Sequence, residues 1–124
     1  MNALDDHLGL GVLVGQNLSS VKEAGEAVVF TLTDGRRYKL YHESDCCESV
    51  DLEEVDGNLT DLHGLVTVAM SEEEAGESTH DDSCTITTIR IATETATVTM
   101  TWRGESNGYY RETPTFEEMN SCQK

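Results

Sequence analysis

The chain has 124 residues, of which 37% are hydrophobic, and its 24 acidic and eight basic residues give a formal net charge of −16. Single domains cluster at about 100–150 residues, so the length predicts one domain over residues 1–124. So acidic a chain repels the phosphates of nucleic acids and anionic lipids, because binding them requires Lys and Arg that displace counterions. We therefore expect no direct nucleic-acid binding. No apolar run is long enough for a membrane span, so we expect no membrane association either.

The negative charge is concentrated in the middle of the chain. Residues 40–89 contain fourteen carboxylates and no Lys or Arg, whereas the ten carboxylates elsewhere nearly balance the eight basic residues. A block of this kind is either a solubilising surface or a surface for a basic protein or a divalent cation.

The first 25 residues form an N-terminal segment without a clear element. Gly9, Gly11 and Gly15 argue against a long helix, although Asp5 suits the cap of a short turn. No Lys or Arg precedes Lys22, which is the opposite of a secretory signal. We expect a cytoplasmic protein, whose four cysteines are reduced.

Residues 27–41 predict a β-hairpin. Ala27–Leu32 and Arg36–Tyr41 are rich in β-branched and aromatic residues, and Asp34-Gly35 between them supplies the positive φ of a tight turn. The next segment is ambiguous, because Val50–Val55 fits either a strand or one helical turn.

The following elements alternate between strand and loop. Asn58–His63 predicts a short helix, with Asn58 as its N-cap and Gly64 as its stop, and a strand follows over Leu65–Met70. Ser71–Ser83 has six carboxylates and no apolar residue larger than Ala, which predicts a mobile acidic loop.

The last third of the chain predicts further strands. Cys84–Ile91 and Ala96–Trp102 are rich in Thr and β-branched residues, Gly104–Gly108 forms a turn, and a last strand from Tyr109 ends before Pro114. The predicted fold is α+β but mostly β: one antiparallel sheet system of hairpins with one or two short helices.

Two motifs resemble a family of small phage and prophage proteins that carry a domain of unknown function. One is Tyr41-His-Glu-Ser-Asp-Cys-Cys-Glu-Ser-Val50, and the other is Gly104-Glu-Ser-Asn-Gly-Tyr-Tyr110, which follows it in the same order in that family. The resemblance spans roughly residues 28–118. It implies a phage protein expressed in the cytoplasm of a bacterial host.

We therefore expect a non-enzymatic phage accessory protein that binds a basic surface of a host protein. It would act as a nucleic-acid mimic that inhibits a host defence, of the anti-CRISPR or anti-restriction type; this step is an analogy from size, charge and origin. The expected partner-binding residues are the carboxylates of the central block: Glu43, Asp45, Glu48, Asp51, Glu53, Glu54, Asp56 and Asp61. Trp102, Tyr109 and Tyr110 form a second candidate contact patch, with core packing as the alternative for Trp102.

The alternative function is a metal-binding regulatory module. His42, Cys46 and Cys47 are potential ligands, with His80 or Cys84 as distant additions. The adjacent cysteines lack the spaced pairs of a closed zinc site, so we expect no metal and no cofactor. An enzyme ranks last, because the carboxylates around Cys46 and Cys47 raise a thiol's pKa and so oppose a nucleophilic cysteine.

Overall fold

The computed structural model describes residues 8–25, 27–42, 48–76, 83–106 and 112–119. Eight antiparallel strands form one sheet in the order β4-β7-β6-β5-β1-β2-β3-β8. One half of the sheet contains β1 (Asn17–Ala24), β2 (Ala27–Leu32), β3 (Arg37–Tyr41) and β8 (Thr115–Glu118). The other half contains β4 (Glu48–Asp56), β5 (Gly64–Ala75), β6 (Ser83–Thr93) and β7 (Thr97–Ser106). No helix in these residues is long and apolar enough to cross a membrane.

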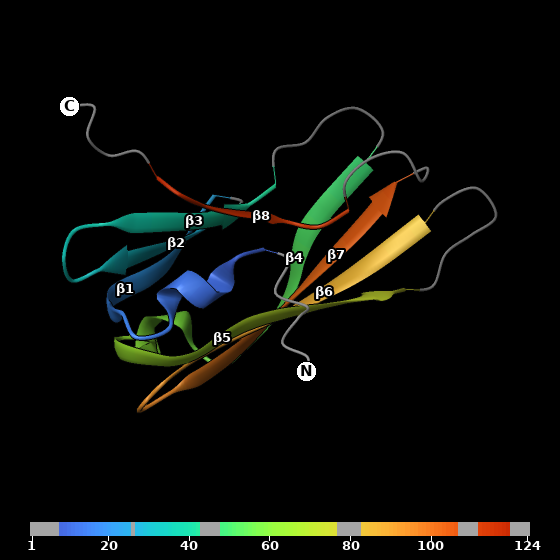
Figure 1. Ribbon diagram of the computed structural model, residues 1–124. Coiled ribbons are helices and arrows are strands. Elements are labelled where there is room, and N and C mark those ends of the chain that lie inside the picture. The colour runs from blue at the N-terminus through green and yellow to red at the C-terminus, as the bar shows by residue number, and fades with distance from the viewer. Residues whose placement is uncertain (1–7, 26, 43–47, 77–82, 107–111, 120–124) are drawn as a thin grey trace.

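The two halves meet through a short junction between β1 and β5. Only Asn17 pairs with Leu65 and Leu18 with Gly64, after which the two strands diverge (Figure 1). The inner faces of both halves then contribute to one core, whose largest fully buried side chains include Phe30, from β2, and Trp102, from β7. Burial of this apolar surface is the main force that holds the halves together.

The predicted hairpin is confirmed. Gly35 has a φ of 97°, its N–H donates to the carbonyl of Leu32 at 3.0 Å, and the N–H of Leu32 donates to the carbonyl of Arg36 at 2.8 Å. Val28 and Phe30 alternate with half-buried residues along β2, as one face of a strand requires.

Three strands contain a β-bulge that changes which residues face the core. The register shifts lie between Leu18 and Ser20, between Leu52 and Glu54, and between Val66 and Val68. In a regular strand, residues three apart face opposite sides. The extra residue of a bulge brings them to the same side, so that each pair points inward. The inward pairs are Leu18 and Val21, Leu52 and Val55, and Val66 and Ala69.

The α+β expectation is wrong in its helical part. The described residues contain no α-helix, only the 3-10 turns η2 (Leu10–Leu13) and η3 (Leu59–Asp61). Asn58 does cap η3, because its side-chain oxygen accepts from the N–H of Thr60 at 3.1 Å. The segment is too short for a full helix because β5 begins at Gly64, three residues after the end of the turn.

Two strand boundaries also differ from expectation. Ser71–Ala75 belongs to β5 and Ser83 to β6, so the expected loop over Ser71–Ser83 is shorter, and its residues 77–82 lie outside the described residues. The glutamates of this stretch tolerate a strand because they are exposed. The last strand, β8, follows Pro114 instead of ending before it, because Phe116 pairs with Leu40 of β3.

Candidate interaction surface

Charge is distributed unequally between the two halves of the sheet. The strands β1, β2, β3 and β8 contain three carboxylates and three basic residues. The strands β4 to β7 contain nine carboxylates, five of them in β4, three in β5 and one in β7, against only Arg90 and Arg103. The acidic block of the sequence is therefore folded into one half of the molecule.

The bulge in β4 determines which of its side chains face the solvent. Val50 is buried, and Leu52 and Val55 are half-buried. Without the extra residue at Glu53, Glu54 would face inward and Val55 would face the solvent. With it, all the carboxylates between Val50 and the end of β4 are exposed: Asp51, Glu53, Glu54 and Asp56, here called the acidic ribbon.

The outer face of this half carries three rows of side chains that cross the sheet from β4 to β5. Residues directly paired in adjacent strands share a face, so the pairing registers define the rows. The first row is Asp51, Arg103, Ile86 and Glu74; the second is Glu54, Thr101, Thr88 and Glu72; the third is Asp56, Thr99, Arg90 and Met70.

Each row begins with a carboxylate on β4, and the first two end with a carboxylate on β5. Three strand spacings of about 4.8 Å place the two lines of carboxylates roughly 14 Å apart. The DNA major groove, about 12 Å wide, has a similar width. Exposed Glu72 and Glu74 thus belong to the same face as the ribbon, although 16 or more residues separate them from it in the chain.

Arg103 is the cation within the first row. Its Nε donates to the Glu105 carboxylate at 2.8 Å, and this hydrogen bond raises the pKa of Arg103 above its usual value, with a smaller contribution from Glu53. Glu105 is exposed and Arg103 is only half-buried, so solvent screens the pair and it contributes little stability. The ribbon itself has no ion pair within the described residues.

The structure places most of the expected partner-binding carboxylates, but not on one surface. Asp51, Glu53, Glu54 and Asp56 form the ribbon, Glu48 opens β4, and Asp61 is exposed in η3. Glu43 and Asp45 lie outside the described residues. The sequence reasoning missed Glu72, Glu74 and Glu105 as members of this face, because it placed the first two in a loop and the third in a turn.

One residue of the expected aromatic contact patch is buried. Trp102 is 2% exposed and belongs to the core, as the alternative for that residue predicted. Tyr109 and Tyr110 lie outside the described residues.

The metal candidates are not brought together in the described part of the chain. His42 is half-buried, and Cys84 is a buried free thiol. Cys46, Cys47 and His80 lie outside the described residues. Among the residues that the structure describes, no three His, Cys, Asp or Glu side chains form a group that could bind a metal.

A partly buried carboxylate lies at the open end of the same half of the sheet, on its inner face. Glu112 accepts hydrogen bonds from the hydroxyls of Ser106 at 2.5 Å, Thr85 at 2.8 Å, and Ser83. Burial is the largest single effect and raises the pKa of Glu112, but the three hydrogen bonds together outweigh it and lower the pKa below the usual 4.5. The group fastens the segment before β8 to β6 and β7.

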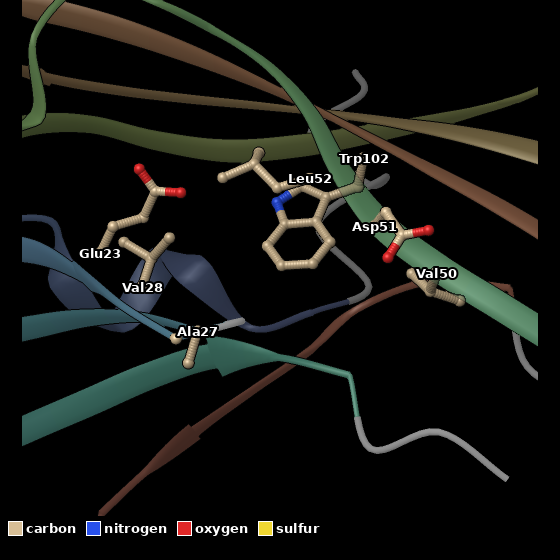
Figure 2. A pocket seen from close by; sticks show the side chains of 8 residues that line it. Glu23, Ala27, Val28, Val50, Asp51, Leu52 and Trp102 are labelled. Carbon is tan, nitrogen blue, oxygen red and sulfur yellow. The ribbon is translucent and has the colours of Figure 1, made fainter.

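A hollow of about 150 Å³ lies between the two halves, beside the ribbon strand (Figure 2). Its walls come from the β1–β2 hairpin, from β4 and from β7: Glu23, Ala27, Val28, Val50, Leu52 and Trp102. The indole nitrogen of Trp102 is buried and has no hydrogen-bond partner.

These features define an antiparallel β protein with one acidic face and a hollow beside its edge strand. The chain belongs to a family described as a domain of unknown function (DUF7448), whose model matches residues 12–115. No curated protein and no solved structure matches the chain.

Proposed function

We propose that the protein is a non-enzymatic interaction protein whose acidic outer face, formed by β4 to β7, binds the basic nucleic-acid-binding surface of another protein. In keeping with the sequence resemblance to phage proteins, we take that partner to be a protein of the bacterial host, and a defence protein that handles nucleic acid fits best. The protein would then occupy the site that nucleic acid normally fills.

The observation that carries this proposal is the pair of carboxylate lines on one rigid face. Asp51 and Glu54 on β4 lie in the same rows as Glu74 and Glu72 on β5, so the spacing between the lines is fixed by the sheet. A solubilising charge needs no such alignment. Negative charge held on a sheet attracts a basic channel over long range and raises the association rate by about 10- to 1000-fold, in a manner that salt suppresses.

The test is a displacement assay on immobilised duplex DNA. Basic proteins of a bacterial lysate are loaded on the DNA, and purified protein is then added at low salt. We expect the wild-type protein to elute a specific DNA-binding protein. The variant D51K/E54K/E72K/E74K, which reverses both lines, should elute none. Raising the salt to about 0.5 M during the addition should abolish the effect of the wild type.

Two controls distinguish an effect of the acidic outer face from an effect of the total negative charge. D61K/E118K reverses two exposed carboxylates outside the rows, and for equal charge it is compared with the pair variant E54K/E72K. Polyglutamate matched in total charge tests for non-specific elution. The proposal is wrong if E54K/E72K elutes the DNA-binding protein as efficiently as D61K/E118K does. It is also wrong if polyglutamate elutes the same protein as efficiently as the wild-type protein does.

A further inference from the structure

Among the residues that the structure describes, no strand pairs with the edge of β4 opposite β7. In the described part of the chain, β4 pairs with β7 alone and stands at the end of the strand order. Opposite it lies β1, whose residues from Ser20 to Ala24 pair only with β2, because β5 leaves β1 after Leu18. Two unpaired strand edges therefore face each other.

A groove separates these two edges. It contains the hollow of about 150 Å³ near Trp102 and a second hollow of about 530 Å³. The second hollow is lined by Val21, Lys22 and Glu23 of β1, by Val55 of β4, and by residues 57–60. Glu23 lines both hollows, so they are neighbours along the same strand. The length of nine residues in β4 is sufficient for an added strand.

The smaller hollow contains an unsatisfied donor next to a carboxylate. Trp102 is 2% exposed and its Nε1 has no partner. Figure 2 shows this nitrogen on the side of the indole ring that faces Glu23 and Val28, with the side chain of Leu52 next to it. A ligand hydroxyl that accepts from the indole would satisfy this buried donor, and its own proton would be donated to the exposed carboxylate of Glu23.

We propose that the groove receives an extended segment of a partner protein, which adds as a strand to the free edge of β4 and alternates basic residues with small hydroxyl residues. This inference rests on the proposed function and specifies the form of the partner. Successive side chains of a strand point to opposite faces. Those on the outer side lie beside the acidic ribbon and are Lys or Arg, while those on the inner side enter the groove.

Threonine is the inner residue that fits the smaller hollow best. Its hydroxyl accepts from Trp102 Nε1 and donates to the Glu23 carboxylate, and its methyl group contacts the aliphatic wall formed by Val28. Leu52, which is half-buried, has to turn aside for the hydroxyl to reach the nitrogen. Main-chain hydrogen bonds to β4 supply affinity and the alternate side chains supply specificity, as in other strand additions.

The test uses a synthetic peptide with four Lys-Thr repeats, acetylated and amidated. We expect saturable binding with protection of β4 amides from hydrogen exchange. Replacing every Thr with the isosteric Val should weaken binding by about three- to tenfold, the cost of one net hydrogen bond. A peptide with the same residues arranged as four Lys followed by four Thr should not protect β4. Equal protection by that peptide would contradict strand addition.

Variants of the protein test the contribution of the smaller hollow to peptide binding separately from that of the acidic ribbon. Trp102→Phe should remove the preference for Thr over Val, and Glu23→Gln, at an exposed position, should reduce it without affecting the fold. Ala27→Leu, which fills the hollow, should weaken binding of the Lys-Thr peptide by at least about tenfold. If Ala27→Leu and Glu23→Gln leave peptide binding and the Thr preference unchanged, the groove is not the site.

The outcome also distinguishes the two proposals. Reversal of both carboxylate lines should abolish DNA displacement whether or not a strand is added at β4. If displacement depends on the lines but the peptide protects no β4 amide, then strand addition is wrong and the proposed function stands. If the peptide binds at β4 but reversal of the lines leaves displacement unchanged, the proposed function is wrong.

Discussion

Gly104 and Glu112 are in main-chain contact across the inner face of the sheet. A side-chain carbon at Gly104 would lie 1.9 Å from the carbonyl oxygen of Glu112 and 2.6 Å from its carbonyl carbon. The missing side chain at Gly104 is therefore what allows the segment before β8 to cross β7 and to place Glu112 among its three hydroxyl donors.

Gly104→Ala should destabilise the protein by about 2–3 kcal/mol or more, because main chain and not a flexible side chain occupies the space. Urea unfolding followed by circular dichroism measures this. Thr101→Ala, three residues away in the same strand and half-buried, is the matched control and should cost well under half as much. Equal losses for the two variants would show that the crossing segment yields easily.

Glu112→Gln should destabilise the protein by about 1–2 kcal/mol at pH 7, because hydroxyl donors that now bond a carboxylate lose a charged acceptor. Glu118→Gln, at an exposed position in β8, is the control and should change little.

The cost of Glu112→Gln should also depend on pH. The folded-state pKa of Glu112 lies below its usual value of 4.5. A lowered pKa contributes stability that is fully present above the unfolded-state pKa and is lost as the pH falls through the folded-state pKa. The difference in unfolding free energy between wild type and variant should therefore be constant above about pH 5.5 and shrink below about pH 4.5. A difference that grows on acidification would contradict the sign of the shift.

Deletion of Glu53 should be tolerated, with a change of less than about 1 kcal/mol, since it removes the extra residue of the bulge and leaves Leu52 and Val55 facing inward. Deletion of Asp51 removes the same charge but forces Glu53 inward and Leu52 outward. It should cost at least about 3 kcal/mol, through burial of a charge and loss of apolar contacts. Thermal melts of the two variants measure these losses. If deletion of Glu53 costs more stability than deletion of Asp51, contacts other than the bulge determine which residues of β4 face inward.

Neutralising the ribbon should promote self-association. Charged side chains on an edge strand prevent pairing between edges of different molecules. The variant D51N/E53Q/E54Q/D56N should therefore form dimers or larger species, as measured by sedimentation velocity. D61N/E94Q, which neutralises two exposed carboxylates outside the strands, is the control. A monomeric ribbon variant at high concentration would show that these charges are not needed to keep the edge free.

The sequence predicts local features of this fold better than features that depend on the bulges. The β2–β3 hairpin was predictable because Asp34-Gly35 defines the turn within the segment itself. Leu52 and Val55, by contrast, are three residues apart, which is a helical spacing, and so Val50–Val55 stayed ambiguous. The spacing of Leu18 and Val21 likewise left β1 unpredicted within the N-terminal segment.

The candidate surface was predictable only in part. The acidic block was visible as a count, and the exposed residues of β4 were among those expected. The rows were not visible, because they require the registers of β5, β6 and β7. Glu112 carries no local signal either, since its donors Ser83, Thr85 and Ser106 come from two other strands.

The unequal charge of the two halves gives the molecule a large electric dipole moment, directed along the line that joins them. In the field of a basic partner such a dipole experiences a torque, so the protein turns its β4–β7 half forward before contact. Orientation would then precede docking over about one Debye length, roughly 8 Å at physiological ionic strength. A larger fraction of collisions begins with the correct face, and this advantage belongs to the arrangement of the charges and not to their total.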